Sequence, residues 1–67
     1  MRVRYDRLWK LMKNNKMTKR DLAHAANFSP YMMGQFTKDA YVSLKGIATL
    51  CGIFHCNIED IVEIIED

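Results

Sequence analysis

Two helix start signals, eleven residues apart, constrain the fold of this chain more than any other feature of its sequence. Thr18 and Ser29 are hydroxyl residues of the kind that cap helix N-termini, and apolar residues at helical spacing follow each of them. Asp21 stands three residues after Thr18, where its carboxylate can complete a capping box. Pro30 occupies the first helical position after Ser29, where its missing N–H is not needed. Residues 19–38 are therefore predicted to form two short helices.

A sharp turn between these helices is predicted at Asn27, because Asn is the residue other than Gly that most readily accepts a left-handed backbone. Leu22 and Ala26 give the first helix a narrow apolar stripe. Met33 and Phe36 continue this stripe on the second helix, so the two helices are expected to share one core. The residues left facing outward from the second helix are Pro30, Tyr31, Gln35 and Lys38.

Two capped helices joined by a tight turn are typical of a helix-turn-helix. The run resembles that of the phage repressor/Cro type of helix-turn-helix regulator (the xenobiotic-response-element family), especially its small single-domain bacterial members. That family has a small residue at the position of Ala23, and apolar residues at the positions of Leu22, Ala26, Phe28, Met33 and Phe36. This chain departs from the family at Asn27, where Gly is usual, and it lacks the usual Gly near Asp39. The resemblance covers the whole chain, but only residues 19–38 are specific.

Patterns outside this motif predict three more helices. Residues 6–13 have apolar side chains at helical spacing, with basic residues on the outside. Ser43 caps a helix whose expected buried face contains Leu44, Ile47, Ala48, Leu50 and Cys51. Asn57 begins a last helix with Asp60 as its capping partner, and its expected apolar stripe is Ile58, Ile61, Val62 and Ile65. We therefore expect one compact all-α domain of five helices over residues 1–67.

The first five residues alternate apolar and basic side chains, which indicates either a short strand or an extended arm. The β-branched run at residues 61–65 offers a conceivable pairing partner, but its spacing favours a helix. We therefore expect an extended N-terminal arm.

The formal net charge of +2 is less informative than its distribution. Eight of the ten basic residues lie in the first twenty positions, and five of the eight acids, Asp67 included, lie in the last nine. This polarity suits a protein that presents its N-terminal half to a polyanion and keeps its C-terminal helix away from it. Solvated helix faces explain the same pattern equally well.

The resemblance implies binding to double-stranded DNA, with the second helix of the motif in the major groove. It places Pro30, Tyr31 and Gln35 toward the bases, with Met32 beside them and Lys38 beyond. Helix N-termini attract phosphates, and cations stand at two of them. The residues assigned to DNA binding are Thr18, Lys19, Arg20, Ser29, Pro30, Tyr31, Met32, Gln35, Lys38, Ser43 and Lys45. The alternative for the cations is that they only keep the surface soluble.

Other kinds of site find little support in the sequence. Cys51 and His55 have the i, i+4 spacing of a helical metal pair and Cys56 is adjacent, but a fourth ligand is not evident. We expect no metal, no cofactor, no small-molecule substrate and no catalytic site. Both cysteines are expected to be reduced, and because no apolar run approaches a membrane span or a signal peptide, a cytoplasmic location is expected.

The predicted function is a sequence-specific DNA-binding transcriptional regulator, with repression as the expected mode. A homodimer on two half-sites is expected because one recognition helix covers few base pairs. Candidate dimer residues are Ile53, Phe54, Ile64 and Ile65. The alternative is a protein-binding module, such as an antitoxin or adaptor, because the second helix carries few base-reading side chains.

Overall fold

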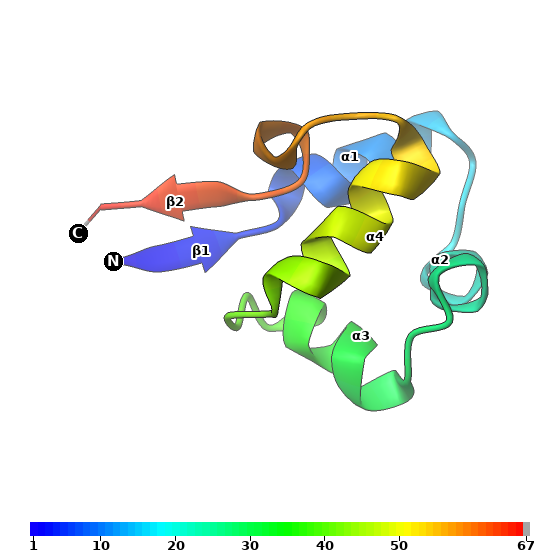
Figure 1. The fold of residues 1–67 in the computed structure, drawn as a ribbon, viewed down its shortest axis with the longest axis horizontal. Helices are drawn as coiled ribbons and strands as arrows, with labels where there is room; N and C mark the ends of the chain where they lie inside the picture. Colours follow the sequence, from blue (N-terminus) through cyan, green and yellow to red (C-terminus); the bar gives the residue numbers. More distant parts are fainter. Residues whose placement is uncertain (67) are drawn as a thin grey trace.

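A computed structural model describes residues 1–66, and Asp67, the last acid of the C-terminal group, lies outside the described residues. Within these residues, four α-helices form the body of the molecule, and the N-terminal and C-terminal segments meet in a small antiparallel sheet (Figure 1). The elements are β1 (Arg2–Arg4), α1 (Asp6–Asn14), α2 (Lys19–Ala26), α3 (Pro30–Thr37), α4 (Leu44–Phe54), the 3₁₀ turn η1 (Ile58–Asp60) and β2 (Glu63–Ile65). None of the helices in this part of the chain has the length and apolar character needed to cross a membrane.

The predicted start signals of α2 and α3 and the predicted stop signal of α2 are confirmed. The Thr18 hydroxyl accepts a hydrogen bond from the Asp21 N–H at 3.1 Å, and an Asp21 carboxylate oxygen accepts one from the Thr18 N–H at 2.9 Å. The Ser29 hydroxyl accepts the Met32 N–H at 3.1 Å. Asn27 has the expected left-handed backbone, with φ of 56°. The helix-turn-helix therefore forms from local signals.

The prediction of a fifth helix is wrong. Asn57 donates its N–H to Asp60 at 3.1 Å as expected, but this capping pair begins only the short turn η1. The chain then becomes β2, which pairs with β1 so that Val3 lies opposite Ile64. Because β-branched residues favour strands and β1 provides backbone partners, the run becomes part of a two-stranded antiparallel sheet. The predicted N-terminal arm is correspondingly a strand.

The core lies where the helices meet the base of the small sheet. Leu8, Leu22, Phe36, Leu50 and Ile61 each have 0% of their surface exposed. The ring of Tyr5 packs edge-on against Phe36, with 4.8 Å between ring centroids, and Phe28 stacks on Phe36 at 5.7 Å. Two residues expected on the buried face of α4, Leu44 and Ala48, are instead exposed. The apolar stripe of α4 is therefore narrower than the sequence predicts.

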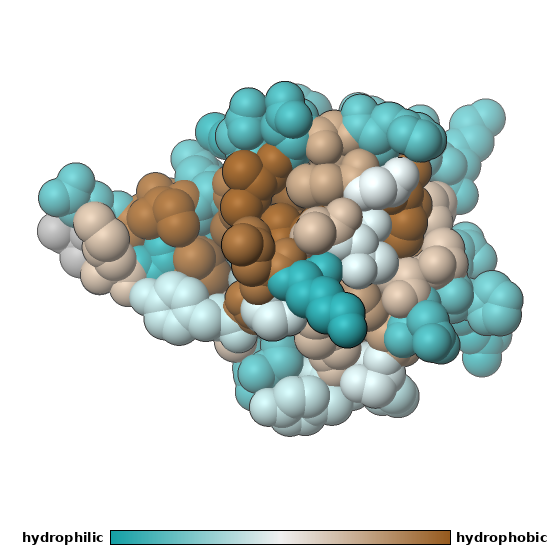
Figure 2. Space-filling view, viewed as in Figure 1, coloured by the Kyte–Doolittle hydropathy of each residue, from teal (hydrophilic) through white to brown (hydrophobic). Residues whose placement is uncertain are grey.

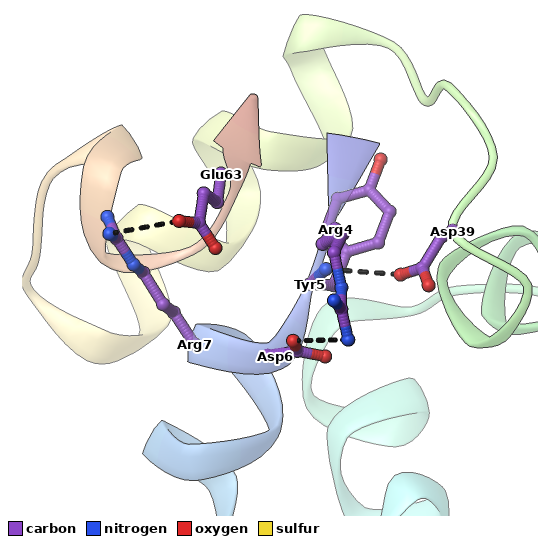
Figure 3. Close-up of polar contacts among 6 residues, drawn as sticks. All are labelled: Arg4, Tyr5, Asp6, Arg7, Asp39 and Glu63. Atoms are coloured by element: carbon purple, nitrogen blue, oxygen red, sulfur yellow. Dashed lines mark hydrogen bonds and ion pairs between the residues drawn. The ribbon is translucent and has the colours of Figure 1, made fainter. Parts of the chain in front are cut away.

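Polar contacts of Tyr5, which follows β1, and of Arg7, in the first turn of α1, reach distant parts of the chain (Figure 3). The Tyr5 N–H donates to Asp39 at 3.1 Å, and the Tyr5 hydroxyl donates to the Ala40 carbonyl at 2.7 Å. Arg7 donates to the Glu59 carbonyl at 2.7 Å and lies 3.7 Å from the Glu63 carboxylate. Folding therefore brings Arg7, from the basic N-terminal region, to Glu63, one of the C-terminal acids.

Candidate nucleic-acid interface

The outer side of α3 is open to solvent at its beginning and just beyond its end. Pro30 and Lys38 are exposed, and Tyr31 exposes 74% of its surface. Proline fits the first turn because Ser29 caps the helix through the Met32 N–H. Tyr31 therefore lies in the first turn of a short helix with a capped N-terminus, and its side chain is exposed.

Gln35 does not face outward as freely as its position in the sequence predicts. Its side chain is half-buried, and its amide nitrogen donates to the Tyr31 hydroxyl at 3.2 Å. Its carbonyl oxygen is buried and has no hydrogen-bond partner among the described residues. Bidentate bonding to adenine requires both the amide nitrogen and the carbonyl oxygen of a glutamine. In this conformation the carbonyl oxygen is not accessible to a base, and one of the two amide N–H donors is used by Tyr31.

Met32 is half-buried and packs toward α4, although the resemblance places it beside the base-facing residues. A Cβ atom on residue 46 would lie 2.5 Å from the Met32 Cε atom. Gly46 therefore gives Met32 room to pack, and a larger residue would require the flexible end of Met32 to move. Interior Gly weakens a helix by about 1 kcal/mol relative to Ala. At Gly46 this cost is accompanied by close packing of α3 against α4, because the missing side chain leaves space for Met32.

The N-terminus of α2 lies beside the C-terminal end of α3. The Lys19 ammonium is 3.4 Å from the Thr37 hydroxyl and 4.7 Å from the centroid of the Trp9 ring. Arg20 follows on the same helix and is exposed. The capping bonds from the Thr18 N–H and hydroxyl, in that order, hold the pKa of Asp21 below its usual range. The Asp21 carboxylate is therefore committed to the helix cap.

The N-terminus of α4 lies beside the turn between α2 and α3. The Ser43 hydroxyl accepts the Gly46 N–H at 3.2 Å, and Lys45 is exposed next to it. An open groove of about 300 Å³ runs between this N-terminus and the turn, with Asn27, Met32 and Lys45 among its lining residues. Cation-bearing helix N-termini therefore flank α3 at both ends, which is the arrangement that favours phosphate binding.

Two residues near this surface were missed by the sequence reasoning. Thr37 contacts Lys19, and its hydroxyl also donates to the Met33 carbonyl at 3.0 Å. Trp9 is half-buried, and the Lys19 ammonium lies over its ring. A cation–π contact between residues ten positions apart on different helices leaves no periodic signal in the sequence.

The cysteine and histidine residues near the end of α4 do not assemble into a metal-binding group. His55 ends the helix with a left-handed backbone, at φ of 53°, and its side chain is exposed. No group of three or more potential ligands gathers anywhere within residues 1–66. Burial raises the pKa of the Cys56 thiol, and nearby Cys51 adds to this effect.

Comparison with known proteins agrees with this geometry. The family model of the Cro/C1-type HTH DNA-binding domain matches residues 7–67. The crystal structure of the transcriptional regulator VanUg, Form II, superposes with a TM-score of 0.94 and 32% sequence identity over 98% of this chain and 88% of that chain. Comparison with curated proteins returns no match. The chain belongs to the Cro/C1-type helix-turn-helix family of DNA-binding domains.

Proposed function

We propose that this protein is a transcriptional regulator that binds double-stranded DNA with the outer side of α3 in the major groove. The observation that carries the proposal is that the start of α3 is exposed and that a cation-bearing helix N-terminus lies beside each end of this helix. A helix of this type fits the major groove, and N-termini on either side can meet the phosphates that border it. The likeness to a solved transcriptional regulator supports the regulatory role.

Tyr31 is the leading base-reading residue in this proposal. Its hydroxyl already accepts the Gln35 amide N–H, so its own proton can point to an acceptor on DNA. Guanine N7 and O6 and thymine O4 are such acceptors in the major groove. Gln35 orients the Tyr31 hydroxyl through this hydrogen bond. Bidentate contact of Gln35 with adenine requires its amide to turn away from Tyr31. Pro30 contributes shape, since its side chain has no hydrogen-bonding group.

Phosphate contacts supply most of the affinity and set the register of α3 on the duplex. Lys19, Arg20 and Thr18 lie at the N-terminus of α2. Ser43 and Lys45 supply the same kind of site at α4. Ser29 and Lys38 stand at the two ends of α3 and add two more polar side chains to the proposed phosphate-binding surface.

Repression by occupation of an operator is the simplest mechanism, because it needs only stable binding where polymerase must bind. A short recognition helix covers few base pairs, so we expect two copies on half-sites about 34–36 Å apart. A protein of this kind works in the compartment that holds the chromosome, which in a bacterium is the cytoplasm.

The test is the salt dependence of binding to a fluorescently labelled random duplex, followed by fluorescence anisotropy. Each neutralised phosphate contributes about −0.9 to the slope of log affinity against log salt concentration. We expect a steep negative slope, with tighter binding once a preferred site has been selected from a random pool. A flat slope, or absence of binding at low salt, would contradict the proposal.

A protein-binding module remains the second candidate, and the buried carbonyl oxygen of Gln35 favours it. With that oxygen buried, α3 offers few groups that discriminate bases. This candidate predicts that random duplex DNA fails to bind at low salt while the fold stays intact by circular dichroism. The anisotropy experiment therefore separates the two functions.

A further inference from the structure

A hollow lies where α1 ends and α2 begins, at the end of the molecule away from the sheet (Figure 1). It is lined by Trp9, Met12, Lys13, Met17 and Lys19, and its volume is about 350 Å³. It is separate from the hydrophobic surface that Figure 2 shows over β2 and the neighbouring part of α4. We call it the tryptophan pocket.

The turn at the end of α1 builds the floor of the tryptophan pocket. The Met17 N–H donates to the Met12 carbonyl at 2.9 Å, and the Lys16 N–H donates to the Lys13 carbonyl at 3.1 Å. Lys16 itself has a left-handed backbone, with φ of 56°. These features define a Schellman motif, which brings the residue after the turn back against the last turn of the helix. Met17 therefore packs beside Met12, and the two thioethers give the pocket an apolar floor.

Two exposed lysines complete the lining, and neither has an anionic partner. The Lys19 ammonium lies 4.7 Å from the centroid of the Trp9 ring and 3.4 Å from the Thr37 hydroxyl. Neither Lys13 nor Lys19 takes part in an ion pair among residues 1–66. An ammonium group has three N–H donors, so both lysines keep donors for an anion.

We propose that the tryptophan pocket binds a small aromatic carboxylate, with the ring against the apolar lining and the carboxylate on Lys13 and Lys19. The volume lies within the 300–1,000 Å³ usual for small-molecule pockets. The polarizable sulfur atoms of Met12 and Met17 pack well against an aromatic ring, and the indole adds an aromatic face. The carboxylate gives both ammonium groups a charge-assisted hydrogen bond, which is stronger than a neutral one.

Other occupants match only part of the pocket. A phosphate of DNA matches the two lysines, but it leaves the apolar hollow unfilled. A neutral apolar molecule fills the hollow, but it desolvates the ammonium groups without giving them a partner. A small molecule that joins an aromatic ring to a carboxylate satisfies the apolar floor and the cations together.

Occupation of the pocket also has a consequence for DNA binding, and this part rests on the proposed function. Lys19 belongs both to the pocket and to the proposed phosphate-binding surface beside the end of α3. A carboxylate bound to Lys19 neutralises the charge that a phosphate would meet there. Because phosphate contacts carry no sequence information, the ligand should weaken binding to all duplexes alike. The ligand would therefore act as an inducer that releases the protein from DNA.

The first test is the binding of naphthoate to the free protein, followed by two-dimensional ¹H–¹⁵N NMR. Trp9 is the one tryptophan of the chain, so its indole N–H gives a unique signal from within the pocket. Naphthylmethanol keeps the ring and lacks the charge, whereas acetate keeps the charge and lacks the ring. Lys19→Ala removes one cation of the pocket, and Lys10→Ala, an exposed lysine of α1 outside the pocket, is the matched control.

We expect naphthoate to shift the indole signal to saturation. Naphthylmethanol and acetate should each bind the wild type at least about tenfold more weakly, and Lys19→Ala should bind naphthoate more weakly by a similar factor. Lys10→Ala should bind naphthoate like the wild type. An unshifted indole signal, or a Lys19→Ala variant that is folded by circular dichroism and binds naphthoate as tightly as the wild type, would overturn the inference.

The second test adds naphthoate to the protein bound to a labelled random duplex, with acetate at the same concentration as the control for ionic strength. We expect naphthoate to weaken duplex binding in the wild type but not in Lys19→Ala, because that variant lacks the shared cation. Naphthoate that binds the wild type without changing its affinity for the duplex would overturn the inducer role. A protein that binds naphthoate but no duplex would contradict the proposed function and leave the ligand site standing.

Discussion

The Gln35 amide donates a hydrogen bond to the Tyr31 hydroxyl one turn earlier on α3, with 3.2 Å between nitrogen and oxygen. The bond fixes which part of each side chain DNA can meet. The Tyr31 oxygen is occupied as an acceptor, so the hydroxyl proton is the group left for a partner. The Gln35 carbonyl oxygen remains buried, which makes tyrosine the more exposed half of the pair.

Tyr31→Phe should weaken binding to a selected site while leaving random duplex almost unaffected. The substitution keeps the ring and removes only the hydroxyl, whose hydrogen bond to a base is worth about 0.5–1.5 kcal/mol. The expected loss for the selected site is therefore about two- to twelvefold. Competition binding by fluorescence anisotropy measures both affinities. An equal loss on both duplexes would instead assign the hydroxyl to a phosphate.

Lys19→Ala should weaken binding to all duplexes alike and make the salt slope shallower by about one unit. Its ammonium lies between Trp9 and Thr37, at the end of α3, where a phosphate of the groove edge is expected. Lys10→Ala, an exposed lysine on α1, is the matched control and should leave both quantities unchanged. A change in sequence preference with an unchanged slope would contradict the assigned role.

Asp21→Asn should lower the stability of the fold near neutral pH. The variant should also lose less stability than the wild type when the pH is lowered into the acid range. The folded pKa of Asp21 lies below its ordinary value of 3.8, because the Thr18 N–H and hydroxyl bond the carboxylate. The ionised form therefore stabilises the fold above the unfolded pKa, and this contribution disappears as pH falls through the lower, folded pKa. Melting temperatures of both proteins across the acid range test this. Parallel curves for the two proteins would show that the Asp21 charge contributes nothing.

Tyr5→Phe should destabilise the protein by about 1–2 kcal/mol. The ring stays buried against Phe36, but the bond from the hydroxyl to the Ala40 carbonyl is lost. Burial, followed by the charge of Asp39, raises the pKa of Tyr5 above its ordinary value of 10.0. The hydroxyl's contribution is therefore complete below the ordinary value and lost as pH rises through the folded pKa. Urea unfolding at neutral and alkaline pH should show the wild type approaching the variant.

Local signals made the helix-turn-helix predictable. Thr18, Ser29 and Ser43 each accept the N–H expected of a helix cap, and Asn27 takes the expected left-handed backbone. These contacts join residues at most three positions apart, so residue type and spacing are enough to identify them.

The sheet was not predictable in the same way. Val3 pairs with Ile64 across almost the whole chain, and the run at residues 61–65 fits a helix or a strand by its composition. Only the folded body brings the two ends together, and it also brings Arg7 to Glu63. Tertiary packing likewise decides which side chains of α3 and α4 are buried and which are exposed. Met32 packs toward Gly46, the Gln35 carbonyl oxygen is buried, and Leu44 is exposed.

The most direct test of the DNA-binding surface is a titration of isotopically labelled protein with a short duplex, followed by two-dimensional ¹H–¹⁵N NMR. We predict that the largest shift changes fall on amides at the start of α3, around Tyr31, and at the N-termini of α2 and α4, around Lys19 and Lys45. Amides around Ile64 should change little. Shifts concentrated around the sheet while α3 stays unperturbed, or no change at low salt, would contradict the account.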